Sequence, residues 1–252
     1  EIVILTATSG DTGKAAMAGF ADVPGTRIIV FYPKNGVSPI QKKQMVTQKG
    51  KNTHVVAIHG NFDDAQTGVK KIFTDPALKA ELAQHNKMFS SANSINWGRL
   101  LPQIVYYFSA YLDLVNAKKI TMGDAINVVV PTGNFGNILA SYYAKRMGLP
   151  VHKFICASNS NNVLTDFIRT GTYDKKRAFY TTISPSMDIL VSSNLERLLY
   201  HLCGEDTEKL TGWMNALQSG GAYTVDAATA DAVRALFYGG CCDDQETVEV
   251  IR

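Results

Sequence analysis

Two glycines between an expected strand and an expected helix mark the first stretch that could do chemistry, Pro131-Thr132-Gly133-Asn134-Phe135-Gly136-Asn137. Residues 125–130 before it are apolar and mostly β-branched, which predicts a buried parallel strand. Residues 138–147 after it predict an amphipathic helix that ends at Gly148. At such a junction, free backbone N–H groups and the positive end of the helix dipole converge on an anion. Taken alone, the glycines are equally typical of a tight turn in any doubly wound fold.

A second stretch, Thr8-Ser9-Gly10-Asp11-Thr12-Gly13-Lys14, also lies between an expected strand and an expected helix. It is not the phosphate loop of nucleotide-binding proteins, because that motif needs a glycine at position 8 and a Ser or Thr at position 15. Its hydroxyls and backbone N–H groups still suit a carboxylate or a phosphate. Asp11 at such a place is more often a helix cap than a catalytic group. The Gly133 stretch likewise lacks the leading glycine and the following acidic residue of the dinucleotide fingerprint, which disfavours a nicotinamide enzyme.

A third stretch, residues 90–99, is dense in Ser and Asn and ends in Arg99 at an expected helix start. These side chains together can surround a phosphate, with paired charge-assisted bonds from the guanidinium. The alternative is a helix cap at Ser94 or Asn96 beside an exposed arginine. Three anion-suited junctions in one chain favour binding over capping.

The elements that must position these stretches alternate between strands and helices. The first half predicts strands at residues 2–5, 27–32, 53–58 and 88–89, and helices ending near Phe20 and at 38–49, 61–73 and 76–84. A long helix at 96–118 precedes the Gly133 junction and a strand at 153–157, and later helices are expected at 162–170, 187–203, 207–217 and 226–237. The fold class is therefore α/β, with two parallel-sheet units and a helix-rich C-terminal half. We expect a smaller domain at 1–120 and part of a larger one at 121–252.

Composition excludes several classes of protein. The 252 residues are 46% hydrophobic and carry 25 basic against 22 acidic side chains, with no basic run interleaved with aromatics, so nucleic acid is not an expected partner. No apolar segment is long enough for a membrane span, and no signal peptide is present. Four cysteines without ligand or disulfide spacing predict reduced thiols and a cytoplasmic location. The absence of a starting methionine, and an uncapped helix expected at 243–252, suggest a piece of a longer protein.

The three stretches together resemble threonine synthase, a pyridoxal-phosphate enzyme of the tryptophan-synthase-β fold (fold type II). The resemblance covers essentially the whole chain. It is carried by residues 6–13, by residues 91–99 with Pro102-Gln103 and Tyr106-Tyr107, by residues 131–137, and by residues 184–189 with Ser192-Ser193-Asn194. It implies conversion of O-phospho-L-homoserine and water to L-threonine and phosphate, with pyridoxal 5'-phosphate as cofactor and a monomer or homodimer as the assembly.

The resemblance also implies roles for individual residues. The cofactor phosphate would be held by the glycine stretch: Gly133, Asn134, Phe135, Gly136 and Asn137. The substrate α-carboxylate would be held by Thr8, Ser9, Asp11 and Thr12. The substrate phosphate would be held by Asn93, Ser94 and Arg99, with Asn96 as a weaker candidate. Residues 184–188 would lie near the cofactor without an assigned role.

Two features of the family have no counterpart here. Its Schiff-base lysine stands in a Phe-Lys-Asp stretch before the first loop, which this sequence lacks, and Lys14 stands on the wrong side of that loop. The C-terminal His-Thr-Ala run that contacts the pyridine nitrogen is also absent. We therefore expect no catalytic residue and no turnover from these 252 residues alone. The alternatives are another fold type II lyase, such as a serine or threonine dehydratase or a cysteine synthase, and a non-catalytic anion-binding module.

Overall fold

The chain forms two compact units, which are described separately. The computed structural model describes residues 1–93 and 96–252. Unit 1 comprises Glu1–Asn96 and unit 2 comprises Trp97–Arg252. Both contain parallel sheets flanked by helices, as expected for an α/β protein.

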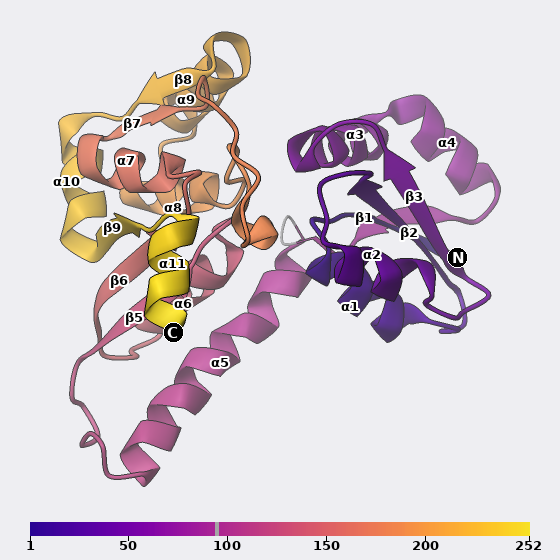
Figure 1. Ribbon diagram of the computed structural model, residues 1–252. Helices are drawn as coiled ribbons and strands as arrows, with labels where there is room; N and C mark the ends of the chain where they lie inside the picture. The colour runs from indigo at the N-terminus through magenta and orange to yellow at the C-terminus, as the bar shows by residue number, and fades with distance from the viewer. Residues whose placement is uncertain (94–95) are drawn as a thin grey trace. The chain divides into compact units, whose positions relative to one another are not determined.

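Unit 1 is a four-stranded parallel sheet in the order β3-β2-β1-β4 (Figure 1). Its elements in chain order are β1 (Ile2–Ala7), α1 (Asp11–Phe20), β2 (Thr26–Pro33), α2 (Pro39–Val46), β3 (Thr53–Ile58), α3 (Phe62–Thr74), α4 (Pro76–Gln84) and β4 (Met88–Ser91). Strand β1, the first in the sequence, is an interior strand of this sheet and pairs in parallel with β4. The junctions that follow β1 and β4 are therefore neighbours at the carboxyl ends of the strands.

Alternate side chains of the unit 1 strands face opposite layers of helices. Ile4, Ile28 and Val30 pack with Met17 of α1 and Met45 of α2 in one buried cluster. On the other face, α3 packs against β1 and β2 (Figure 1). Burial on both faces is the usual state of a parallel sheet, and it explains why these strands are rich in β-branched residues.

Unit 2 contains a three-stranded parallel sheet, β5-β6-β9, and a separate antiparallel pair, β7-β8. Its elements are α5 (Trp97–Asn116), β5 (Ile126–Pro131), α6 (Gly136–Arg146), β6 (Val151–Ser158), α7 (Val163–Thr170), β7 (Thr172–Asp174), a 3-10 turn (Pro185–Met187), α8 (Leu195–Leu202), α9 (Thr207–Gly220), β8 (Ala222–Thr224), α10 (Ala227–Leu236), β9 (Phe237–Cys241) and α11 (Asp244–Ile251). Its core is continuous from α5 through α6 and β6 to α7, α8 and α10.

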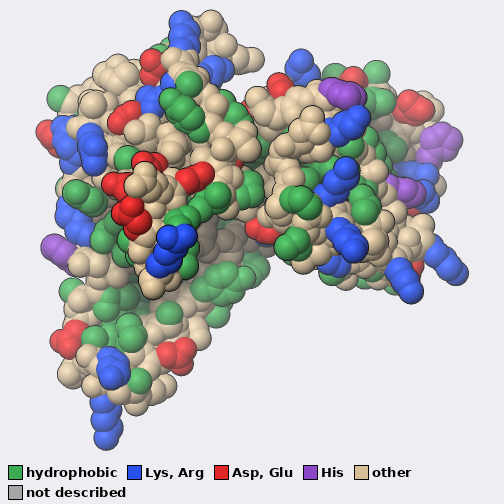
Figure 2. Space-filling view, in the orientation of Figure 1, with side chains coloured by type: hydrophobic (Ala, Val, Ile, Leu, Met, Phe, Trp, Pro, Cys, Tyr) green, Lys and Arg blue, Asp and Glu red, His purple; other side chains and the backbone are tan. Residues whose placement is uncertain are grey.

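The division between the units falls before α5, whereas the sequence places it near residue 120. The reason is that α5 packs along α6, and its Leu100, Ile104 and Tyr111 belong to the buried core of unit 2. The outer side of the same helix is apolar as well, with Leu101 52%, Val105 64% and Tyr106 59% exposed, and Figure 2 shows apolar side chains along this helix.

Most expected elements are present, with two informative differences. The helix expected at 187–203 begins only at Leu195, because residues 185–194 form a 3-10 turn and an irregular segment. Strand β9 was not expected, since Gly239 and Gly240 are unfavourable in strands. The glycine is needed there: a Cβ on Gly239 would lie 2.9 Å from Thr165 Cα, so α7 approaches the strand closely.

Across residues 1–93 and 96–252, the helices are all too short or too polar to cross a membrane.

Candidate active site

The glycine stretch forms the junction between β5 and α6 in unit 2. The Thr132 amide donates to Ala157 O at 2.8 Å and so continues the pairing of β5 with β6. Helix α6 begins at Gly136, after Phe135 in the left-handed conformation (φ 63°), and its N-cap residue makes no side-chain capping bond. The first N–H groups of a helix have no acceptor inside it. In the described chain, those of α6 are therefore suited to an anion.

Two of the five residues expected at the cofactor phosphate use their side chains for contacts within unit 2. Phe135 is 1% exposed, with its ring centroid 5.7 Å from that of Phe237. Asn137 faces α5: its Nδ2 donates to Gln103 Oε1 at 3.0 Å, and its Oδ1 accepts from Tyr107 Oη at 2.6 Å. Burial raises the pKa of Tyr107 well above its ordinary value, so the phenol stays a donor. These two residues can offer an anion their backbone N–H groups.

The carbonyl groups of the glycine stretch are held by residues 190–194, which we call the clamp segment. Ser192 Oγ donates to Gly133 O at 2.7 Å. The Asn194 backbone N and Nδ2 both donate to Asn134 O, at 3.2 and 2.9 Å. Beside these bonds, Ser193 Oγ and Asn134 Oδ1 are buried polar atoms with no partner among the described residues. Such atoms are rare in folded proteins and often mark a missing ligand.

A buried carboxylate fixes the segment that precedes the clamp. Asp188 is 6% exposed. Its Oδ1 accepts from Asn159 Nδ2 at 2.7 Å, Asn161 Nδ2 at 3.0 Å and Thr182 Oγ1 at 2.7 Å, and its Oδ2 accepts from the Thr182 amide at 2.9 Å. Four donors compensate the burial of this charge. The 3-10 turn held in this way packs against the glycine stretch, since a Cβ on Gly133 would lie 2.8 Å from Ser186 O.

The stretch at the end of β1 in unit 1 is built around Thr8, which is 1% exposed. Its Oγ1 accepts from the amides of Gly10 and Gly13 at 2.9 and 2.8 Å, so it caps α1 from within the loop. Asp11 is exposed and accepts from Gln41 Nε2 at 2.9 Å. Ser9 and Thr12 are half-buried beside them. In the described chain, Thr8 thus accepts the loop amides at the start of α1, and the polar side chains of Ser9 and Thr12 do not cap the helix.

Asn93 ties the β4 junction to the β1 junction. Its Oδ1 accepts from the Ala7 amide at 2.8 Å and its Nδ2 donates to Ala7 O at 2.6 Å. The side chain thus continues the β1–β4 pairing beyond Ser91, like one more strand residue. It fixes the loop rather than projecting a free amide. Ser94, expected at the substrate phosphate, lies outside the described residues.

Arg99 lies in the first turn of α5 and belongs to unit 2, whereas Thr8, Ser9, Asp11, Thr12 and Asn93 belong to unit 1. Burial lowers the pKa of its guanidinium, while the neighbouring Tyr106 opposes this shift. Gln103 Nε2 donates to Arg99 O at 2.8 Å, and Gln103 also binds Asn137. The turn that carries Arg99 is therefore hydrogen-bonded to the start of α6.

Sequence reasoning did not assign roles to the residues that hold the loop in place: Gln103, Tyr107, Asp188, Ser192 and Asn194. All of them fall in the stretches that carry the family resemblance, which was the signal available. Each of them has a partner between 27 and 60 residues away in sequence, and only the tertiary structure identifies these partners.

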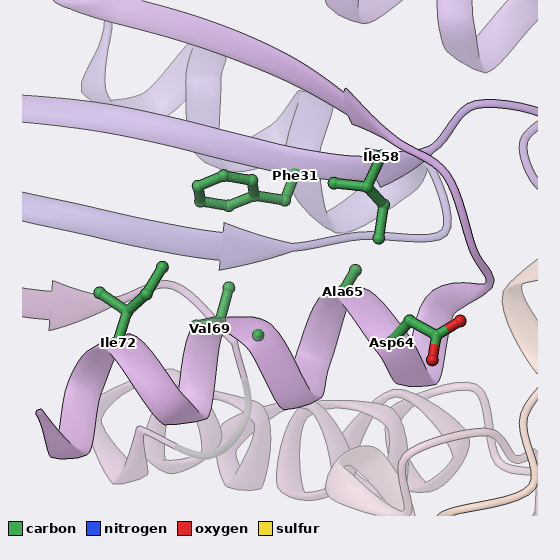
Figure 3. Close-up of a pocket in the computed structure, with 7 residues that line it drawn as sticks. Phe31, Ile58, Asp64, Ala65, Val69 and Ile72 are labelled. Carbon is green, nitrogen blue, oxygen red and sulfur yellow. The ribbon is translucent and has the colours of Figure 1, made fainter.

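Other parts of the described chain offer little chemistry. No group of three His, Cys, Asp or Glu in residues 1–93 and 96–252 could hold a metal ion. A cavity of about 170 Å³ lies in unit 1 between α3 and strands β2 and β3 (Figure 3). Its walls are mainly apolar, including Phe31, Ile58 and Val69. The carboxylate at one end, Asp64, accepts from the Asn61 amide in the α3 capping box. No residue expected at the active site lines this cavity.

Comparisons with known proteins identify the family and the fold of the chain. Residues 1–250 match the family described as "Pyridoxal-phosphate dependent enzyme". Human "Threonine synthase-like 1" is 46% identical over 256 residues, covering 99% of this chain and 34% of that protein. The structure of pyridoxal-phosphate-bound threonine synthase from Brucella melitensis superposes with a TM-score of 0.84 at 42% identity, covering 98% of this chain and 51% of that one. The structure of yeast threonine synthase superposes with a TM-score of 0.84 at 37% identity, covering 100% of this chain and 49% of that one.

The chain thus spans between a third and a half of the length of these relatives. It has their fold, which is that of the fold type II enzymes. The chain belongs to the family of pyridoxal-phosphate dependent enzymes, as a homologue of the threonine synthases, and pyridoxal phosphate is its cofactor.

Proposed function

We propose that the whole protein converts O-phospho-L-homoserine and water to L-threonine and phosphate. The observation that carries the proposal is the uncapped start of α6 behind the glycine stretch, with its carbonyl groups bonded to the clamp segment. Together with threonine synthase relatives at 38 to 42% identity, it supports a cofactor phosphate at this junction.

The residues present fit the phosphate of the cofactor. Gly133 and Gly136 allow close approach, and the backbone N–H groups of residues 134–138 supply donors. Ser193, between Ser192 and Asn194 in the clamp segment, has a buried hydroxyl with no partner among the described residues. When bound, pyridoxal phosphate supplies an electron sink for negative charge that develops on the substrate. The protein's part is to hold both molecules and to keep water and protons where the reaction needs them.

Substrate binding is assigned to the two remaining stretches. Ser9 and Thr12, with the backbone around Thr8 and Asp11, would bind the α-carboxylate at the start of α1. Arg99 would bind the substrate phosphate through paired N–H···O bonds, and Asn93 and Ser94 are proposed as further residues of this subsite. Anchoring the substrate at both ends would orient it for loss of the phosphate and addition of water.

Proton transfer needs a basic group that we do not assign to a residue of this sequence. The family's lysine stands in a Phe-Lys-Asp stretch that is absent here, and Lys14 is bonded to Gln48 instead. We therefore propose that these 252 residues alone bind phosphate-bearing ligands without turnover.

The test is a comparison of Arg99→Ala with Arg234→Ala in the whole protein. Arg234 is a matched control because it lies on α10 and pairs with the exposed Asp231. We expect Arg99→Ala to lower kcat/KM for O-phosphohomoserine by at least a hundredfold, since a charge-assisted pair of bonds is lost, with cofactor affinity changed little. Equal losses of substrate use and cofactor binding would count against the role of Arg99.

A second candidate function is supported by the names of the relatives. Those at 46% identity are called threonine synthase-like 1 rather than threonine synthase. A whole protein that binds the cofactor and O-phosphohomoserine, but releases phosphate without forming threonine, would favour another lyase of the same fold. We further propose that the protein is cytoplasmic and that it is a monomer or a homodimer.

A further inference from the structure

The clamp segment makes its bonds to a specific part of the glycine stretch, the carbonyl oxygens. Gly133 O accepts from Ser192 Oγ, and Asn134 O accepts twice from Asn194. These three bonds from Ser192 and Asn194 all end on carbonyl oxygens, which are the acceptors of the loop. The clamp therefore engages the atoms of the peptide groups that would repel an anion.

The orientation of the donors follows from the planarity of the peptide bond. In a trans peptide the C=O of one residue and the N–H of the next point in opposite directions. A bond that fixes Gly133 O toward the clamp thus turns the Asn134 N–H away from it. The bonds to Asn134 O turn the Phe135 N–H in the same way. These two N–H groups directly precede the free donors at the start of α6.

The clamp is itself rigidly held, so it can impose this geometry. Ser192 is 6% and Asn194 1% exposed. The Ser192 amide donates to Tyr173 Oη at 2.8 Å, and Tyr173 Oη donates to Leu190 O at 2.9 Å. Arg197 donates to Asn194 Oδ1 at 2.6 Å, which fixes the amide with Nδ2 toward the loop.

We propose that Ser192 and Asn194 are positioning residues for the phosphate subsite. They fix two peptide groups so that four or five backbone N–H groups converge on one anion before it binds. Without them, a loop with two glycines and a left-handed Phe135 can rotate a carbonyl oxygen toward the phosphate, which repels it. This inference rests on the proposed role of the glycine stretch in binding the cofactor phosphate.

The test measures how much the phosphate group contributes to binding. Pyridoxamine 5'-phosphate and pyridoxamine are titrated calorimetrically into the purified protein, with inorganic phosphate as a third ligand. Neither amine has an aldehyde, so neither reacts with lysines. The variants are Ser192→Ala, Asn194→Ala and the conservative Ser192→Thr. Ser141→Ala is the matched control, because Ser141 is a fully buried serine of α6 whose hydroxyl has no partner in the described chain.

We expect Ser192→Ala to lower the affinity for pyridoxamine 5'-phosphate and for inorganic phosphate about tenfold, which is the effect of losing one hydrogen bond to a buried acceptor. The affinity for pyridoxamine should not change. Asn194→Ala removes a second donor and should weaken the phosphate ligands further. Ser192→Thr keeps the hydroxyl and should restore binding, and Ser141→Ala should bind like the wild type.

Two results separate this inference from the proposed function. If the wild type binds the two amines equally, the glycine stretch is not a phosphate site, and both ideas fall. If the wild type prefers the phosphate ester and Ser192→Ala keeps that preference, the proposed function stands and the positioning role is wrong. A lower melting temperature with an unchanged preference is also evidence against it, because it indicates a purely structural role.

Discussion

Gly133 is the position at which a single methyl group should damage the site most. A Cβ there would lie 2.8 Å from Ser186 O and 3.7 Å from Met187 Cα, both backbone atoms of the 3-10 turn. A carbon atom cannot approach an oxygen that closely, so the turn or the loop must move by several tenths of an ångström. The turn cannot yield easily, because Asp188 holds it through four hydrogen bonds.

Overpacking of this kind typically destabilises a protein by about 1 to 3 kcal/mol. With a urea dependence of about 2 kcal/mol per molar, Gly133→Ala should lower the midpoint of unit 2 unfolding by roughly 0.5 to 1.5 M. Both tryptophans, Trp97 and Trp213, lie in unit 2, so intrinsic fluorescence in urea reports the unfolding of this unit. The same displacement should weaken phosphate and pyridoxamine 5'-phosphate more than pyridoxamine, because it moves the loop donors.

The matched control is Gly212→Ala. Gly212 lies inside α9 with no atom within 4 Å of the added methyl group, so alanine there should raise stability by about 0.5 to 1 kcal/mol through helix propensity. Gly133→Ala with wild-type stability and wild-type phosphate preference would refute the close packing of the turn on the glycine stretch.

Three further changes test other parts of the structure. Asp188→Ala should reduce the stability of unit 2 by about 3 kcal/mol in urea, since it leaves several buried donors unpaired; a loss under 1 kcal/mol would contradict the network. Asn93→Ala should reduce the stability of unit 1 by about 2 kcal/mol, measured by hydrogen exchange of the β1 amides, because two buried bonds to β1 are lost. Unchanged exchange would show that the side chain does not fix the loop. Burial raises the pKa of the Cys156 thiol from 9.0 to about 11, so at pH 8 a thiol reagent should modify the exposed Cys241 and Cys242 but not Cys156. The thiol ionises at a lower pH in the unfolded chain than in the folded one, so the free energy of unfolding should fall progressively from pH 9 to pH 11. This decline should be absent in Cys156→Ala. If the variant shows the same decline, the Cys156 thiol is not its cause.

The sequence by itself determined the local structure of the chain. Alternation of apolar runs with capped helices predicted β3 and α4 at their observed residues, because strand and helix preferences act over a few residues. Each anion-suited stretch was also visible, since glycines and hydroxyls between a strand and a helix are a local signal. Motifs combined over the whole length identified the family and its cofactor.

The tertiary structure decided which polar atoms of those stretches remain available. Asn93 and Asn137 look alike as ligands in the sequence, yet their amides are bonded to β1 and α5. Strand β9 contains two glycines, and Gly239 is needed because a Cβ there would collide with the backbone of Thr165 in α7. Ser192 and Asn194 reach the glycine stretch across about 60 residues of chain. Such pairings depend on the packing of distant elements, and no local preference encodes them.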